Sequence, residues 1–89
     1  MATQSLNLKI ISPQDILFQG EVYAVSSKNS SGDFDILPEH TDFITIIENQ
    51  PIVIRKTPKE KITFHFPLAI MYTNENIVTI YAKTASPEL

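Results

Sequence analysis

Side chains able to bind a metal ion or move a proton gather between residues 33 and 42. They are four carboxylates and one histidine, Asp33, Asp35, Glu39, His40 and Asp42. A hard cation needs several oxygens converging from one loop, but Ile36 and Leu37 interrupt this run and no glycine supplies the required turn. Zinc prefers more histidine or cysteine than the cluster offers. The pattern therefore indicates solvated carboxylates around a turn, and leaves a partner contact or an ordinary corner of the fold as interpretations.

The remaining polar side chains do not indicate catalysis or a cofactor. His40 has no serine nucleophile with an oxyanion-hole motif beside it. His65 alternates with Phe64 and Phe66, so it should lie on the outer face of a strand. The chain has only two glycines and neither a P-loop nor a dinucleotide fingerprint. We expect a protein that is not an enzyme, has no cofactor or metal, and binds no ATP.

Length and composition limit the function further. With 89 residues, 43% of them hydrophobic, the chain makes at most one globular domain. A net charge of −3 argues against a nucleic-acid partner, because phosphate binding needs clustered lysine and arginine. The absence of cysteine excludes disulfides. The N-terminal segment lacks the apolar core of a signal peptide or membrane span, which predicts an intracellular protein.

Apolar and polar residues alternate over most of the chain, as is typical of β-strands. In LNLKII the alternation places Leu6, Leu8 and Ile10 on one face. In ITFHF it points Phe64 and its apolar neighbours Ile62 and Phe66 inward. No stretch has the 3.6-residue apolar repeat of a helix, and β-branched runs recur about every ten residues. The pattern predicts an all-β sandwich or barrel, and its completeness predicts a monomer.

Two segments give more specific predictions. ILFQGEVYAV reads as one continuous strand, with Val22 and Ala24 facing one side of the sheet. Tyr23 and Val25 would face the other side. FITII is apolar throughout, which predicts a strand buried on both faces.

Turns separate the predicted strands. Thr57-Pro58-Lys59-Glu60 suits a β-turn, because the fixed φ of proline fits the second position. Residues 48–50 form a turn before PIVIRK, and residues 73–76 join the last two strands as a hairpin.

Phe34 is unusual because it is an apolar side chain between two aspartates in a polar turn. It has two possible roles. The ring either folds back to plug the end of a sandwich, or stays exposed as an anchor for a partner, since exposed apolar groups tend to mark interfaces. Composition favours the plug, and the anchor stays open.

The order of these segments resembles the N-terminal β-sandwich domain of the epsilon subunit of rotary F-type ATP synthases. The family hallmark runs Gly-acidic-apolar-Gly-Ile-x-Pro-Gly-His, and GDFDILPEH follows it at Gly32, Asp33, Phe34, Ile36, Pro38 and His40. LNLKIISP, LFQGEV, PIVIRK and VTIYAKTA also match, so the resemblance runs from Leu6 to Ala85. It implies a single β-sandwich of two mainly antiparallel sheets with about ten short strands, occupying residues 1–89.

The resemblance implies a central-stalk (rotor) subunit that links the gamma shaft to the membrane c-ring and supports coupling of ATP synthesis to proton or sodium flow. Such a subunit is non-catalytic and does not insert into the membrane. It is peripheral, on the cytoplasmic side of the bacterial inner membrane or the stromal or matrix side in an organelle. The rival hypotheses are a free-standing β-sandwich protein-binding module and a small sugar- or lipid-binding sandwich.

The same resemblance implies two contact surfaces. The ring-facing turn, expected to contact the c-ring, consists of Ser30, Ser31, Gly32, Asp33, Phe34 and Asp35. The shaft-facing corner, expected to lie near the gamma subunit, consists of Leu37, Pro38, Glu39 and His40. In the ring-facing turn, Asp33 and Asp35 would meet basic side chains of the ring through charge-assisted hydrogen bonds.

The chain departs from the family pattern at several positions. Asp35 and Glu39 stand where the family has glycine, Asp42 where it has proline, and Leu68 and Ala69 where it has a glycine pair. If the family glycines at positions 35 and 39 have positive φ, Asp35 can adopt that conformation more readily than Glu39. The departures indicate a divergent or alternative-operon version of the subunit. The family's C-terminal helical hairpin, which inhibits hydrolysis and in some bacteria binds ATP, is not expected in this chain.

Overall fold

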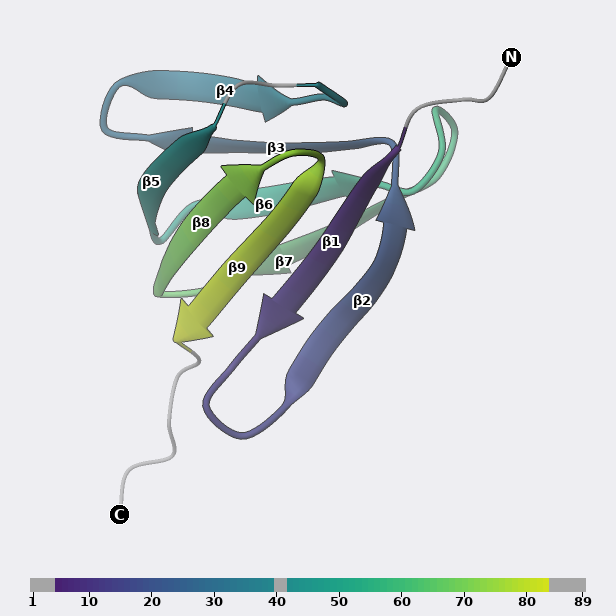
Figure 1. The fold of residues 1–89 in the computed structure, drawn as a ribbon. Helices are drawn as coiled ribbons and strands as arrows, with labels where there is room; N and C mark the ends of the chain where they lie inside the picture. Colours follow the sequence, from purple (N-terminus) through teal and green to yellow (C-terminus); the bar gives the residue numbers. More distant parts are fainter. Residues whose placement is uncertain (1–4, 40–41, 84–89) are drawn as a thin grey trace.

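The computed structural model describes residues 5–39 and 42–83, and these ranges contain nine β-strands and no helix (Figure 1). The strands are β1 Leu6–Ile11, β2 Ile16–Val22, β3 Ala24–Asn29, β4 Gly32–Ile36, β5 Phe43–Glu48, β6 Pro51–Arg55, β7 Lys61–His65, β8 Leu68–Asn74 and β9 Ile77–Lys83. One sheet has the order β2-β1-β9-β8-β5 and the other β4-β3-β6-β7. The predicted all-β sandwich is confirmed, with nine strands in the described ranges where about ten were expected. Nothing in these ranges forms a helix that could span a membrane.

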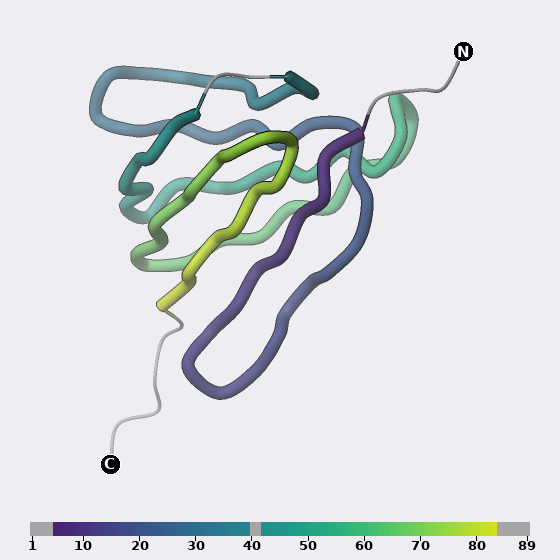
Figure 2. The backbone as a smooth tube through the Cα atoms, viewed as in Figure 1, coloured from purple at the N-terminus to yellow at the C-terminus, as the bar shows by residue number. Residues whose placement is uncertain are grey.

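The two sheets are joined by strands that leave one sheet for the other. Consecutive strands pair as antiparallel hairpins in β1–β2, β3–β4, β6–β7 and β8–β9. After β2, β4, β5 and β7 the chain crosses to the opposite sheet, as its trace shows (Figure 2). β1 and β9 are parallel neighbours, so the first and last strands lie side by side within the five-stranded sheet. The repeated crossings hold the sheets face to face around one core.

The predicted continuous strand over ILFQGEVYAV is wrong. β2 ends at Val22 and β3 begins at Ala24 in the other sheet, with Tyr23 between them. The Tyr23 N–H donates to the Arg55 carbonyl at 2.7 Å, which fixes the bend. Because the strand changes sheets here, Ala24 and Val25 are both buried and the simple alternation is lost.

The predicted two-sided burial of FITII is also wrong. β5 is an edge strand that pairs with β8, and one of its faces points away from the core. Ile44 and Ile46 are 62% and 54% exposed, whereas Ile47 is 1% exposed. A sheet in a sandwich buries one face, so an unbroken apolar run here means an apolar outer face instead of a central strand.

Side chains from both sheets form the core. The alternating residues Leu6, Leu8 and Ile10 of β1 are at most 1% exposed, which confirms their predicted face. From the opposite sheet Ile52 and Ile54 of β6 are fully buried. Such interiors pack as densely as organic crystals, so the two sheets behave as one stiff body.

Aromatic rings extend the core beside β7. Phe66 is buried, and Ile62 and Phe64 are half-buried against the core, as the alternation in ITFHF predicted. The Phe64 ring stacks on Phe66 with centroids 5.8 Å apart and meets Phe18 of β2 edge-on at 6.3 Å. His65 lies on the outer face and is exposed, as expected.

The predicted turns have the expected local structure. The Glu60 N–H donates to the Thr57 carbonyl at 3.3 Å, which places Pro58 at the second position of a β-turn. Between β8 and β9, Glu75 and Asn76 have φ of 51° and 65°. Two residues of positive φ are typical of a type I′ hairpin, whose twist matches that of the strands.

Candidate partner-contact site

The ring-facing turn is the tip of the β3–β4 hairpin. Asn29 pairs with Gly32 across a two-residue loop of Ser30 and Ser31. The Asn29 side chain accepts from the Ser31 N–H at 2.8 Å and donates to Thr45 Oγ1 at 2.9 Å. Gly32 has a φ of 125°, which a residue with a Cβ rarely adopts. The tip is therefore held in one shape and tied to β5 of the other sheet.

Two carboxylates of this turn share one exposed face. In β4 the residues alternate, so Asp33 and Asp35 point outward and are exposed. Asp33 lies opposite Lys28 of β3, and Asp35 accepts a hydrogen bond from the Ser26 hydroxyl. β4 is an edge strand of the four-stranded sheet, so both carboxylates are open to a partner.

Phe34 points to the opposite side of β4 and packs within the domain. Its ring is half-buried against the core and meets Phe43 of β5 edge-on, with centroids 5.4 Å apart. Since β4 and β5 belong to different sheets, the pair closes this end of the sandwich. The geometry supports the plug hypothesis and leaves the outer surface of the turn to the aspartates.

The shaft-facing corner follows the other end of β4. Leu37 is 47% exposed, and Glu39 has a φ of 68°. The Glu39 N–H donates to Asn76 Oδ1 of the β8–β9 turn. His40, the remaining residue of the expected corner, lies outside the described residues.

The four positions where the resemblance implies glycine, Asp35, Glu39, Leu68 and Ala69, differ in backbone conformation. Glu39 adopts the left-handed conformation in which glycine is favoured, so its side chain is accommodated at some cost. Asp35 lies in the extended β4 strand opposite Ser26 and is free of this strain. Leu68 and Ala69 begin β8 in extended conformation as well. Among these changes, the corner at Glu39 is the one that has a conformational consequence.

The described residues of this region form a groove but no metal site. Within residues 5–39 and 42–83, no group of three histidine, cysteine or acidic side chains is placed to hold a metal ion. An open groove of about 550 Å³ runs beside the hairpin tip, lined by Lys28, Asn29, Ser30, Ile44, Thr45, Ile46, Glu48 and Gln50. The lining mixes both charges with amides, hydroxyls and apolar groups, and supplies no nucleophile paired with a base.

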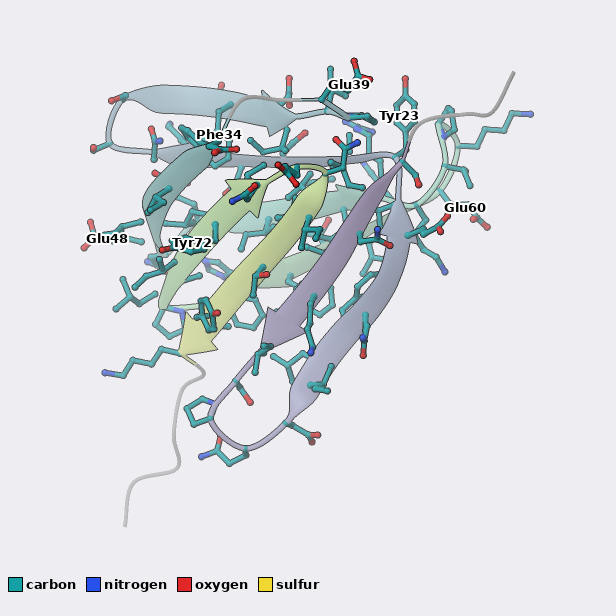
Figure 3. All side chains as sticks on the ribbon, viewed as in Figure 1. Tyr23, Phe34, Glu39, Glu48, Glu60 and Tyr72 are labelled. Carbon is teal, nitrogen blue, oxygen red and sulfur yellow. The ribbon has the colours of Figure 1, made fainter. Side chains whose placement is uncertain are left out.

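An exposed apolar face on the five-stranded sheet escaped prediction. Its members come from β5, β8 and β9 and are 41–62% exposed: Ile44, Ile46, Ile70, Tyr72, Ile77 and Tyr81. Ile46, Ile70 and Tyr81 face one another across three neighbouring strands. Tyr72 projects from the same sheet in Figure 3. The signal was present in the uniform apolarity of FITII, but apolarity alone does not tell an exposed face from a buried one.

Comparison with protein families gives a match over almost the whole chain. The family described as ATP synthase, Delta/Epsilon chain, beta-sandwich domain matches residues 5–88. The ATP synthase epsilon chain of a Nitratiruptor species is 26% identical over 83 residues, covering 93% of this chain and 64% of its own length. The chain spans about half to two thirds of the length of the curated relatives it matches.

Two mitochondrial ATP synthases are among the solved structures that contain a chain of this fold. A chain of the Euglena gracilis enzyme, in its OSCP/F1/c-ring structure, superimposes with a TM-score of 0.82 at 13% identity over 90% of this chain and 51% of that chain. A chain from the central stalk and c-ring of the Tetrahymena thermophila enzyme gives 0.76 at 11% identity over 93% and 66%. At such identities the likeness shows a shared fold.

Proposed function

The chain belongs to the delta/epsilon family of ATP synthase β-sandwich domains, and we propose that it serves as a non-catalytic rotor subunit of the central stalk, joining the gamma shaft to the c-ring. The observation that carries the proposal is the family match over residues 5–88. The two similar solved chains come from structures that contain a c-ring. The work of such a subunit is to transmit torque and to support the coupling of ATP synthesis to ion flow.

The geometry suits a mechanical link. The tip of the ring-facing turn precedes β4, Asp33 and Asp35 of that turn lie within β4, and Leu37 of the shaft-facing corner follows it. The five residues of β4 span about 15 Å at the rise of a β-strand. The strand is fixed to β3 by its ladder and to β5 through the Phe34–Phe43 contact. A strand held in this way keeps the proposed ring contacts at a fixed position relative to the proposed shaft contact.

On the ring side, Asp33 and Asp35 are the proposed contacts. Both are exposed on one face, and the Ser26 hydroxyl orients the second. They would accept charge-assisted hydrogen bonds from arginine or lysine side chains in the loops of the ring. Ser30, Ser31 and Gly32 shape the tip, and Phe34 supports it from within.

On the shaft side, the proposed contact is the corner from Leu37 to His40. Leu37 supplies exposed apolar area, and Pro38 restricts the backbone. In this proposal the chain is a monomer before assembly, binds neither nucleic acid nor ATP, and stays outside the membrane. The assembled subunit lies on the side of the membrane that carries the catalytic head.

Co-purification from the source membranes tests the proposal. A tagged chain should recover the gamma subunit and the c-ring, together with the catalytic subunits, in stoichiometric amounts after mild detergent extraction. The control is the same chain with Phe66→Asp, which places a carboxylate in the core and should abolish folding and recovery. Recovery of a different stable partner, with no synthase subunit, would contradict the proposal and support a free-standing binding module.

A further inference from the structure

The side chain of Asn76 has a contact that its turn does not require. A type I′ turn needs residues that accept positive φ, and glycine or asparagine meets that need through the backbone alone. Asn76, with a φ of 65°, meets it. Its Oδ1 nevertheless accepts the Glu39 N–H from a position 37 residues away. The side chain thus joins the β8–β9 turn to the corner that follows β4.

The other end of this link is anchored in the five-stranded sheet. The Asn76 carbonyl accepts the Asn7 N–H at 2.8 Å, next to the point where β1 and β9 begin their parallel pairing. Asn76 is also flanked by the β8–β9 ladder, in which Asn74 pairs with Ile77. The amide that holds Glu39 therefore projects from a well-fixed turn.

The corner needs a hydrogen bond of this kind to keep its conformation. Glu39 has a φ of 68°, a conformation in which a glutamate persists only when its surroundings impose it. The chain has just left the four-stranded sheet at Ile36 and has not yet joined β5 at Phe43. Within a sheet, the carbonyl of a neighbouring strand accepts a backbone N–H. Glu39 lies outside both sheets, so a side-chain oxygen can act as the acceptor instead.

We propose that Asn76 is a positioning residue for the shaft-facing corner: its side chain holds Glu39 in the left-handed conformation and thereby sets the direction in which Leu37 faces the partner. The inference rests on the proposed function for the identity of that partner, the gamma subunit. Asn76 need not touch the shaft itself. Its hydrogen bond to Glu39 fixes the corner relative to the five-stranded sheet.

Three variants of the full chain distinguish the effect of the Asn76 side-chain hydrogen bond from the effect of the turn's backbone conformation. Asn76→Gly keeps the positive φ and removes the acceptor. Asn76→Asp keeps an acceptor in a residue that tolerates this conformation. Glu75→Gly is the matched control, because Glu75 is the other positive-φ residue of the same turn, at 51°, and is exposed.

Two measurements follow, amide hydrogen exchange at Glu39 by NMR and affinity for the purified gamma subunit. Asn76→Gly should raise the Glu39 exchange rate at least fivefold and weaken gamma binding about tenfold, with little change in melting temperature. Asn76→Asp and Glu75→Gly should stay within twofold of the wild type in both. Unchanged exchange in Asn76→Gly, or equal effects of both glycine variants, would overturn the inference. If the wild-type chain fails to bind gamma, the proposed function fails, and the exchange measurement alone decides whether Asn76 holds the corner.

Discussion

At residues 33 to 36, side chains that pack in or against the core alternate with side chains that are exposed on the surface. Phe34 and Ile36 point inward, whereas Asp33 and Asp35 point outward and are exposed. Stability and assembly should therefore separate between neighbouring residues of one strand. Substitutions of the outward aspartates should affect assembly, whereas substitutions of the inward residues should affect stability.

Replacing both aspartates, as Asp33→Lys with Asp35→Lys, should leave the fold almost unchanged and prevent assembly. Exposed substitutions usually change the free energy of unfolding by at most about 0.5 kcal/mol each. Like charges brought together at an interface cost several kcal/mol. Thermal melting and co-assembly with gamma and the c-ring measure the two effects. Glu21→Lys with Glu60→Lys is the matched control, with the same charge change on exposed residues of other hairpins. Normal assembly and ion pumping by the Asp33/Asp35 variant would show that the turn makes no contact needed for assembly.

Phe34→Ala should instead destabilise the domain. The ring is half-buried and contacts Phe43, so its loss should cost about 1–3 kcal/mol, less than for a fully buried phenylalanine. Urea denaturation followed by circular dichroism provides the measurement. An unchanged midpoint combined with lost binding would identify Phe34 as an anchor and contradict the plug.

Asp35 and Glu39, two of the four positions where the resemblance implies glycine, should respond to glycine in opposite directions. Glu39→Gly removes a left-handed residue with a Cβ and should stabilise the fold by about 0.5–1 kcal/mol. Asp35→Gly puts glycine into an extended strand and should destabilise it by a similar amount. Equal effects on the denaturation midpoint would show that Glu39 is unstrained.

Strands with one buried face follow directly from the sequence, and a strand that changes sheets does not. Alternation in LNLKII and ITFHF correctly gave the inward residues because each segment stays in one sheet. It failed at Tyr23, where the chain turns from β2 into β3 and two consecutive residues become buried. Nothing local distinguishes such a crossing from a continuous strand, because the partner that receives it, Arg55, lies 32 positions later.

The outward face of β5 can be tested with two neighbouring residues. Ile47→Ala creates a cavity in the core and should cost about 2–5 kcal/mol. Ile46→Ala removes an exposed side chain and should cost no more than about 0.5–1 kcal/mol. Chemical denaturation of both variants under one set of conditions makes the comparison. A larger loss for Ile46 than for Ile47 would show that the register of β5 against β8 is shifted by one residue.

For the molecule as a whole, the sequence predicts the two proposed contact surfaces but not the hydrogen bonds that support them. The resemblance predicts the ring-facing turn and the shaft-facing corner from one stretch of sequence, because most of their residues lie in GDFDILPEH. Their supports come from distant elements, as with Thr45 beneath the turn and Asn76 beneath the corner. A hydrogen bond between residues so far apart in sequence depends on how the two sheets stack, so the alternation of apolar and polar residues cannot predict it. The exposed apolar face is likewise a property of the assembled sheet.

The parallel pairing of β1 with β9 has a consequence for synthesis on the ribosome. β9 lies between β1 and β8, so the five-stranded sheet lacks an inner strand until Lys83 has left the exit tunnel. Before that moment the nascent chain holds the β1–β2 hairpin and β8 as separate edges with open hydrogen-bonding groups. Pairings between chain ends form slowly because a long loop must close first. The five-stranded sheet therefore closes only after β9 has emerged, and β9, the last of the nine described strands in chain order, fixes β1 in its place relative to β8.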